Sequence, residues 1–181
     1  MLAQDTLSSI EAVEINHLSA RQAAVNFNLS PWKDRLLLHE KDFADFTTAE
    51  RFGLIISNPP FFEQSLQSND PGKNAAKHEG TLQWSILIGK AATLLSSTGL
   101  LALLIPWHRT KEAIRLAEKH LLHLHRQAFV RADPDKDFFR SMLLLSKFPA
   151  AIISEEITIK ISEKEYSPEF AKLLQPFYLY L

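Results

Sequence analysis

The sequence contains no cysteine, and only 5 of its 181 residues are glycine. The lack of cysteine excludes disulfides, thiolate zinc sites and cysteine nucleophiles, and it is typical of a reducing compartment. The sequence also has no apolar run of the length that spans a membrane, and its first residues do not have the basic and apolar regions of a signal peptide. We therefore expect a cytoplasmic protein without a membrane segment.

A large charge of one sign is missing as well, since 20 basic and 21 acidic residues give a net charge of −1. Such a chain has no overall electrostatic attraction to nucleic acid or to a membrane, so contact with a polyanion requires a local basic patch. Apolar residues, in contrast, make up 46% of the sequence. This is enough to bury the core of a single domain, which we predict over residues 1–181.

Short apolar strands alternate with segments of helical periodicity along the chain. Strands are predicted over residues 8–15, 35–40, 52–57, 100–106, 123–132, 138–148 and 155–162, and helices over residues 16–30, 81–97, 110–122 and 167–174. The strand at 52–57 is apolar enough to be buried on both faces, and Gly99 is expected to end the second helix. The alternation predicts an α/β fold with a parallel, doubly wound sheet that ends in an antiparallel hairpin.

The third predicted strand ends in an unusual turn, "SNPPFF", in which Asn58 is followed by Pro59, Pro60 and Phe61. Neither proline has an N–H donor, so the carbonyl groups around Asn58 and Pro59 remain available to a ligand. The Asn58 side chain adds an acceptor, and the Phe61 ring offers a face on which a planar group can stack. These groups suit an amine on a flat ring, whose hydrogens the carbonyls accept while its lone pair faces an electrophile.

This turn resembles the [DNS]-PP-[YFW] motif of S-adenosylmethionine-dependent methyltransferases that modify nitrogen atoms. Within that group, "SPWKDR", "AAKHEGTL" and the "FYLYL" end are similar to segments of the bacterial tRNA1(Val) adenine-N6 methyltransferases. The resemblance covers nearly the whole chain. It implies a Rossmann-like class I methyltransferase fold, S-adenosylmethionine as the cofactor, and tRNA as the substrate, methylated on the adenine just 3′ of the anticodon.

The resemblance also gives roles to individual side chains. Glu14 would accept hydrogen bonds from the two ribose hydroxyls of the cofactor, and Asp42 from its adenine amine, with Phe43 packed beside that base. Asn58, which also lies next to the cofactor, and Pro59 would hold the target amine. Pro60 would shape the turn and Phe61 would stack on the target adenine, which must leave its own stack to enter such a pocket. The transfer needs no metal.

Several basic residues lie where they can meet RNA phosphates. They are Lys73, Lys77, His78 and Arg109. A solvated charged loop is an equally good interpretation of each one alone. The three histidines His120, His123 and His125 are close together in the sequence, but they lack nearby carboxylate partners, so we do not predict a metal site.

The family's cofactor site normally begins with a strand and a glycine-rich turn, and no glycine precedes Gly53 in this sequence. The chain is therefore expected to start inside the first βαβ unit, without the strand that is central in the family's sheet. A missing inner strand leaves backbone groups without partners. We therefore expect an interrupted sheet and weakened cofactor binding, and a strand-exchanged or other dimer is one way to fill the gap.

Two other functions agree with the sequence. One is a methyltransferase of the same motif class with another target, either guanine in ribosomal RNA or a glutamine side chain in a protein. The other is an RNA-binding protein without catalytic activity, which the absent glycine-rich turn favours.

Overall fold

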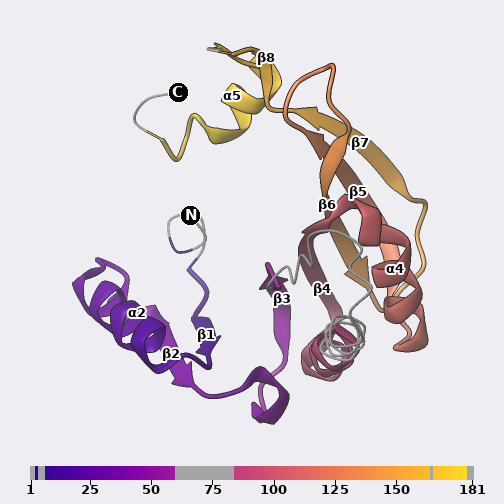
Figure 1. The fold of residues 1–181 in the computed structure, drawn as a ribbon. Helices are drawn as coiled ribbons and strands as arrows, with labels where there is room; N and C mark the ends of the chain where they lie inside the picture. Colours follow the sequence, from indigo (N-terminus) through magenta and orange to yellow (C-terminus); the bar gives the residue numbers. More distant parts are fainter. Residues whose placement is uncertain (1–2, 4–6, 60–83, 164, 179–181) are drawn as a thin grey trace, which may run out of the picture. The chain divides into compact units, whose positions relative to one another are not determined.

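The computed structural model describes residues 3, 7–59, 84–163 and 165–178, which form two compact units. The N-terminal unit comprises Met1–Ala49 and the C-terminal unit Glu50–Leu181. Each unit is described by itself below (Figure 1). The prediction of one domain over residues 1–181 stays a prediction.

The N-terminal unit consists of one helix packed on a pair of parallel strands. Strand β1 (Ile10–Glu14) pairs in register with β2 (Leu36–Glu40), and α2 (His17–Leu29) connects them through the 3-10 turn η1 (Lys33–Arg35). Helix α2 begins as predicted, because the Asn16 side chain accepts a hydrogen bond from the Ser19 N–H at 3.0 Å. A second 3-10 turn, η2 (Phe43–Asp45), follows β2.

The C-terminal unit is built on a five-stranded mixed sheet with the strand order β3-β4-β6-β5-β7. Its strands are β3 (Phe52–Ser57), β4 (Leu95–Pro106), β5 (His123–Arg131), β6 (Phe138–Ser146) and β7 (Ile153–Thr158). Strands β3 and β4 are parallel, as are β5 and β7, and β6 runs antiparallel to both of its neighbours. The predicted α/β fold and the antiparallel hairpin, formed by β5 and β6, are thereby confirmed.

The connections in this unit are helical. Residues 84–94 form a helix before β4, and β4 continues through η3 (Trp107–Arg109) into α4 (Thr110–Lys119). Beyond β7, the short strands β8 (Lys160–Ser162) and β9 (Glu165–Tyr166) pair with each other, and α5 (Pro168–Leu174) follows, capped by Ser167 as predicted. None of the described helices is long and apolar enough to cross a membrane.

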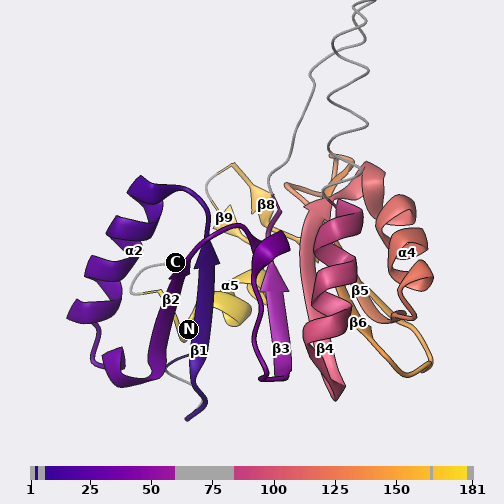
Figure 2. The same ribbon diagram turned by 90° about the horizontal axis from the view of Figure 1, so that it is seen from below.

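The core lies on one face of the five-stranded sheet. Helix 84–94 and α4 both cover this face (Figure 2). Residues from both helices and from the strands below are fully or nearly fully buried there, namely Ile88, Ala91, Ala113, Ala117, Leu101, Ile105, Leu143 and Leu145. At about 25 cal/mol per Å² of apolar surface removed from water, this layer is the main source of the unit's stability.

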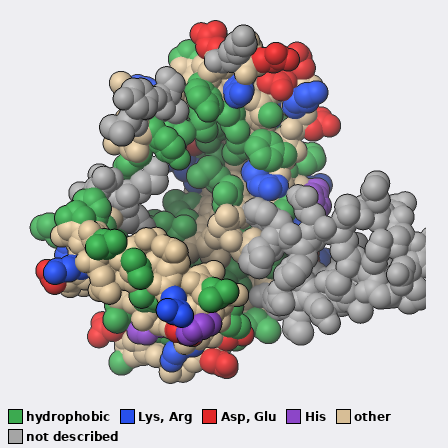
Figure 3. Space-filling view, turned by 60° about the vertical axis from the view of Figure 1, so that its left-hand side comes forward, with side chains coloured by type: hydrophobic (Ala, Val, Ile, Leu, Met, Phe, Trp, Pro, Cys, Tyr) green, Lys and Arg blue, Asp and Glu red, His purple; other side chains and the backbone are tan. Residues whose placement is uncertain are grey.

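The opposite face of the sheet is apolar but exposed, which contradicts one prediction. Strand β3 was expected to be buried on both faces, yet Leu54 is 41% and Ile56 56% exposed. The register places Ile56 beside Ala102 of β4, and Met142 of β6, which is 48% exposed, lies on the same face. Figure 3, which brings this side forward, shows hydrophobic side chains gathered on the C-terminal unit.

The boundary between helix 84–94 and β4 also differs from the prediction. The helix was expected to reach residue 97 and to end at Gly99, but β4 begins at Leu95 and includes Gly99. Between Phe52 and Leu54 the register on β4 jumps from Leu95 to Leu100, so the intervening residues bulge. A Cβ on Gly99 would lie 2.6 Å from the Phe52 carbonyl oxygen, so this glycine permits a close backbone approach rather than a helix stop.

The described strands β1 and β3 are each paired on one side, and a missing inner strand stays a prediction. Among the described strands, β1 pairs only with β2, and β3 pairs only with β4. Strands β1 and β3 therefore each have one edge without a strand partner in the described part of the chain.

Candidate active site

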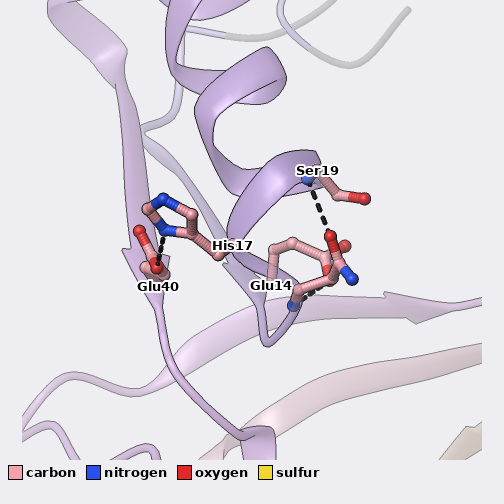
Figure 4. A network of polar contacts seen from close by, with 5 residues as sticks. Glu14, His17, Ser19 and Glu40 are labelled. Carbon is pink, nitrogen blue, oxygen red and sulfur yellow. Dashed lines mark hydrogen bonds and ion pairs between the residues drawn. The ribbon is translucent and has the colours of Figure 1, made fainter.

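Glu14 lies at the carboxyl end of β1, directly before α2 (Figure 4). Its Oε1 accepts a hydrogen bond from the Asn16 N–H at 2.8 Å, and Asn16 in turn caps α2 through Ser19. The half-buried carboxylate is therefore fixed in direction by the turn that starts the helix. That Glu14 receives hydrogen bonds from a ligand with paired hydroxyls stays a prediction.

A second carboxylate, which was not predicted as part of the site, lies beside Glu14. Glu40 is its register partner at the end of β2, and Glu40 Oε1 lies 2.6 Å from His17 Nδ1 (Figure 4). His17 is the first residue of α2, so the pair joins the helix to β2. No local sequence motif predicts this contact, because His17 and Glu40 are 23 positions apart in the sequence.

Asp42 is exposed and caps the 3-10 turn after β2. Its Oδ1 accepts a hydrogen bond from the Ala44 N–H at 2.8 Å. The Phe43 ring is stacked on Phe46 with 6.5 Å between ring centroids, and Phe46 is only 2% exposed. Glu14 and Asp42 thus follow the carboxyl ends of two paired parallel strands, where ligands bind in open α/β sheets.

The described part of the proline turn belongs to the C-terminal unit. Asn58 directly follows β3 and is exposed, whereas the Pro59 ring is buried. An exposed amide anchored by a buried ring fits a group that presents hydrogen-bonding atoms to a substrate. Pro60 and Phe61 lie outside the described residues.

Of the residues predicted to contact RNA, Arg109 is described, and Lys73, Lys77 and His78 lie outside the described residues. Arg109 stacks on Trp84, with its guanidinium carbon 3.8 Å from the ring centroid, and pairs with both carboxylate oxygens of Glu112 at 2.8 and 3.0 Å. Its side chain is 18% exposed. These contacts favour a structural role, and contact with RNA stays a prediction.

The three adjacent histidines have separate surroundings. His120 packs against Gly89, whereas His125 Nε2 lies 2.7 Å from the Ser146 hydroxyl and also contacts the Phe148 carbonyl. A bulge between Leu124 and Arg126 also interrupts the strand beside His123 and His125. Within the described ranges, no group of three or more potential ligands could hold a metal ion.

The chain is similar in sequence to curated bacterial enzymes. It is 33% identical over 179 residues to the tRNA1(Val) (adenine(37)-N6)-methyltransferase of Phocaeicola vulgatus, covering 99% of this chain and 76% of the relative. The enzyme of the same name from Yersinia pestis (strain Pestoides F) is 32% identical over 183 residues, covering 99% of this chain and 74% of that relative. No family model matches the sequence.

Solved structures share the fold at much lower sequence identity. A protein described as a predicted O-methyltransferase from Agrobacterium tumefaciens superposes with a TM-score of 0.68 at 15% identity, covering 92% of this chain and 77% of that one. A TehB-like SAM-dependent methyltransferase from Corynebacterium glutamicum gives a TM-score of 0.56 at 13% identity, covering 81% and 72%. At this identity the likeness supports the Rossmann-like methyltransferase fold alone.

Proposed function

Since the chain belongs to the tRNA1(Val) (adenine(37)-N6)-methyltransferase family, we propose that it transfers a methyl group from S-adenosylmethionine to the N6 amine of an adenine in tRNA. The target is adenine 37, beside the anticodon of a valine tRNA. The observation that carries the proposal is the exposed Asn58 amide, which is followed by the buried Pro59 at the carboxyl end of β3. A cytoplasmic location and tRNA as the partner belong to the same proposal.

The carboxylate acceptors of the N-terminal unit fit the adenosine part of the cofactor. Carboxylates accept hydrogen bonds strongly, and Glu14 and Asp42 follow the carboxyl ends of paired strands, so they can receive hydroxyl and amine hydrogens. Glu14 is held in place by the Asn16 N–H. When bound, S-adenosylmethionine supplies an electrophilic methyl group on a positively charged sulfur.

The turn after β3 orients the nucleophile. The N6 amine donates its hydrogens to the Asn58 side-chain oxygen and the Pro59 carbonyl, which directs the nitrogen lone pair at the methyl carbon. S-adenosylmethionine would supply the methyl group for the new N–C bond and keep the electron pair of the methyl–sulfur bond, and the proton lost by the amine would pass to water. This step depends on positioning and exclusion of water rather than on a strong base.

The test measures methyl transfer from labelled S-adenosylmethionine to unmodified valine tRNA, with digestion of the product to nucleosides. We expect N6-methyladenine from the chain, and a fall in kcat of about 100-fold or more for Asn58→Ala, because the amine loses its acceptor. Asn28→Ala, another exposed asparagine, serves as the matched control and should act at the wild-type rate.

Three results would contradict the proposal. Methylguanine or a methylated protein as the product would identify another target, and full activity of Asn58→Ala would remove the role of the turn. Binding of tRNA without any calorimetric signal for S-adenosylmethionine would favour an RNA-binding protein without catalytic activity. The strand-exchanged dimer stays a prediction, which the mass of the protein in solution tests.

A further inference from the structure

Four aromatic side chains lie at one end of the five-stranded sheet, where β4 and β5 end and β6 begins. We call Trp107, Phe129, Phe138 and Phe139 the aromatic edge. The Trp107 and Phe138 ring centroids are 6.1 Å apart, and those of Phe138 and Phe129 are 5.6 Å apart. Trp107, Phe138 and Phe129 therefore form a continuous row, and Phe139 follows Phe138 at the start of β6.

Two members of the aromatic edge are open to solvent. Trp107 is 42% and Phe139 41% exposed, although both are large apolar side chains. Arginines support the row, since the Arg131 guanidinium carbon lies 5.4 Å from the Phe138 ring centroid and that of Arg140 lies 5.4 Å from the Phe139 centroid. Exposed aromatic rings with guanidinium groups beside them are suited to stacking with unpaired nucleotide bases.

The strand register places the aromatic edge close to the proline turn within the same unit. Ser57 of β3 is paired with Leu103 of β4, so Asn58 is level with Leu104, and Trp107 follows three residues later. Trp107 is therefore separated from Asn58 by about 10 Å along the strand direction and about 5 Å across to the neighbouring strand. Strand β6 brings Phe139 to the same edge, because Arg140 pairs with Pro106. A base adjacent to one held at Asn58 is therefore within reach of Trp107.

The charges around the aromatic edge limit how RNA can approach. The turn between β5 and β6 carries Asp133, Asp135 and Asp137, which repel phosphates on that side. On the β4 side, His108 and Lys111 are exposed. A nucleotide strand is thus expected to place its bases on the rings, with its phosphates toward β4 and few phosphate contacts in total.

We propose that the aromatic edge binds unpaired RNA bases that flank the target adenine, with Trp107 and Phe139 as the stacking residues. The inference rests on the proposed function for the identity of the RNA, since an anticodon loop presents unpaired bases beside the methylated one. Trp107 and Phe139 are positioning residues, because they hold neighbouring nucleotides and do not touch the reacting nitrogen.

The experiment measures binding of the full chain to the unmodified anticodon stem-loop of valine tRNA, without requiring methyl transfer. Trp107→Ala and Phe139→Ala should each weaken binding roughly 5- to 150-fold, whereas Trp107→Phe, which keeps a stacking ring, should retain most of the affinity. Phe148→Ala is the matched control, because Phe148 is 53% exposed and lies beyond the opposite end of β6.

Two further readouts separate stacking from charge and from loss of folding. The RNA should quench the part of the fluorescence that Trp107→Phe removes, which reports directly on contact with this ring. The dependence of binding on salt should be nearly the same for Trp107→Ala and the wild type, since no phosphate contact is lost. A fully paired RNA duplex should bind equally to all variants.

Wild-type affinity of Trp107→Ala and Phe139→Ala would overturn the inference, as would unquenched Trp107 fluorescence at saturating RNA. If Trp107 fluorescence responds to a protein partner and not to RNA, the surface is a protein interface and the inference is wrong. If the anticodon stem-loop RNA binds through Trp107 but no methyl transfer occurs, the proposed function fails and the inference survives. If methyl transfer occurs and loss of both rings leaves it unchanged, only the inference fails.

Discussion

Arg109 can be assigned to folding or to RNA binding by one set of substitutions. Its guanidinium stacks on Trp84, which is 3% exposed, and forms a paired contact with Glu112. The stack joins the start of helix 84–94 to the turn before α4, so it connects the two helices that cover the sheet. We therefore expect Arg109→Ala to destabilise the C-terminal unit rather than to act only on RNA binding.

The expected loss of unfolding free energy in Arg109→Ala follows from its two contacts, with Trp84 and with Glu112. A partly desolvated cation–π stack contributes about 1 to 2 kcal/mol, and an ion pair with limited exposure about 0.5 to 1 kcal/mol. Together they predict a loss of about 1.5 to 3 kcal/mol for Arg109→Ala. For a chain of 181 residues, this corresponds to a fall in Tm of about 3 to 12 °C.

Thermal and urea unfolding of Arg109→Ala, Arg109→Lys and Arg115→Ala test this reasoning. Lysine keeps the charge but cannot stack as a plane or bind both carboxylate oxygens, so Arg109→Lys should lose most of the same stability. Arg115 lies exposed on α4, which follows Arg109, so its replacement should change the free energy of unfolding by less than about 0.5 kcal/mol. A double-mutant cycle with Trp84→Leu isolates the stacking energy.

Loss of tRNA binding without loss of stability in Arg109→Ala would refute the structural role of Arg109. Arg109 contacts RNA if Arg109→Ala unfolds like the wild type but binds tRNA more weakly. The slope of log affinity against log salt concentration should then fall by the amount expected for about one phosphate contact. Retention of tRNA affinity by Arg109→Lys would strengthen that conclusion, because a lysine still provides a point charge for a phosphate.

Two further predictions concern backbone space and surface charge. Gly99→Ala should lower the free energy of unfolding by about 1 to 3 kcal/mol, because its Cβ meets the Phe52 carbonyl oxygen at 2.6 Å. Gly53→Ala is the control, because a Cβ there meets nothing within 4 Å, and it should be nearly neutral in the same urea titration. Equal effects of the two substitutions would contradict the close approach at the bulge. The Arg126 hydrogen bond lowers the pKa of Glu155, so this exposed pair stabilises the fold above the ordinary glutamate pKa and loses its effect as pH falls through the lowered value. Glu155→Gln should therefore reduce the Tm slightly at neutral pH and not in strong acid, and an equal reduction at both would contradict this cause.

Elements whose ends depend on local chemistry could be predicted from the sequence. The Asn16 and Ser167 side chains cap α2 and α5 by hydrogen bonds to residues three positions ahead, so the sequence itself contains both partners. The alternation of apolar strands with helices likewise predicted the α/β class, because each segment carries its own periodicity. Glu14, Asp42 and Asn58 then follow from their places at strand ends.

The remaining features depend on contacts between distant segments. The apolar run of β3 does not reveal that one of its faces stays open, because burial is decided by what packs on a strand and not by its own composition. The role of Gly99 depends on the Phe52 carbonyl of another strand. The Arg109 side chain looked like a surface cation, and only the fold brings Trp84 against it.

The turn that we propose to be catalytic follows β3, an edge strand of the five-stranded sheet. Strand β3 pairs only with β4 among the described strands, its Leu54 and Ile56 side chains are exposed, and a bulge interrupts its ladder after Phe52. Since neither dense packing nor a second ladder holds β3, the register to β4 and the buried Pro59 ring carry most of the positioning of Asn58. The position of this turn therefore depends on β4, which leads directly into Trp107 of η3. Binding of RNA to the aromatic edge would thus act directly after the strand that holds the proposed catalytic residue Asn58 in position.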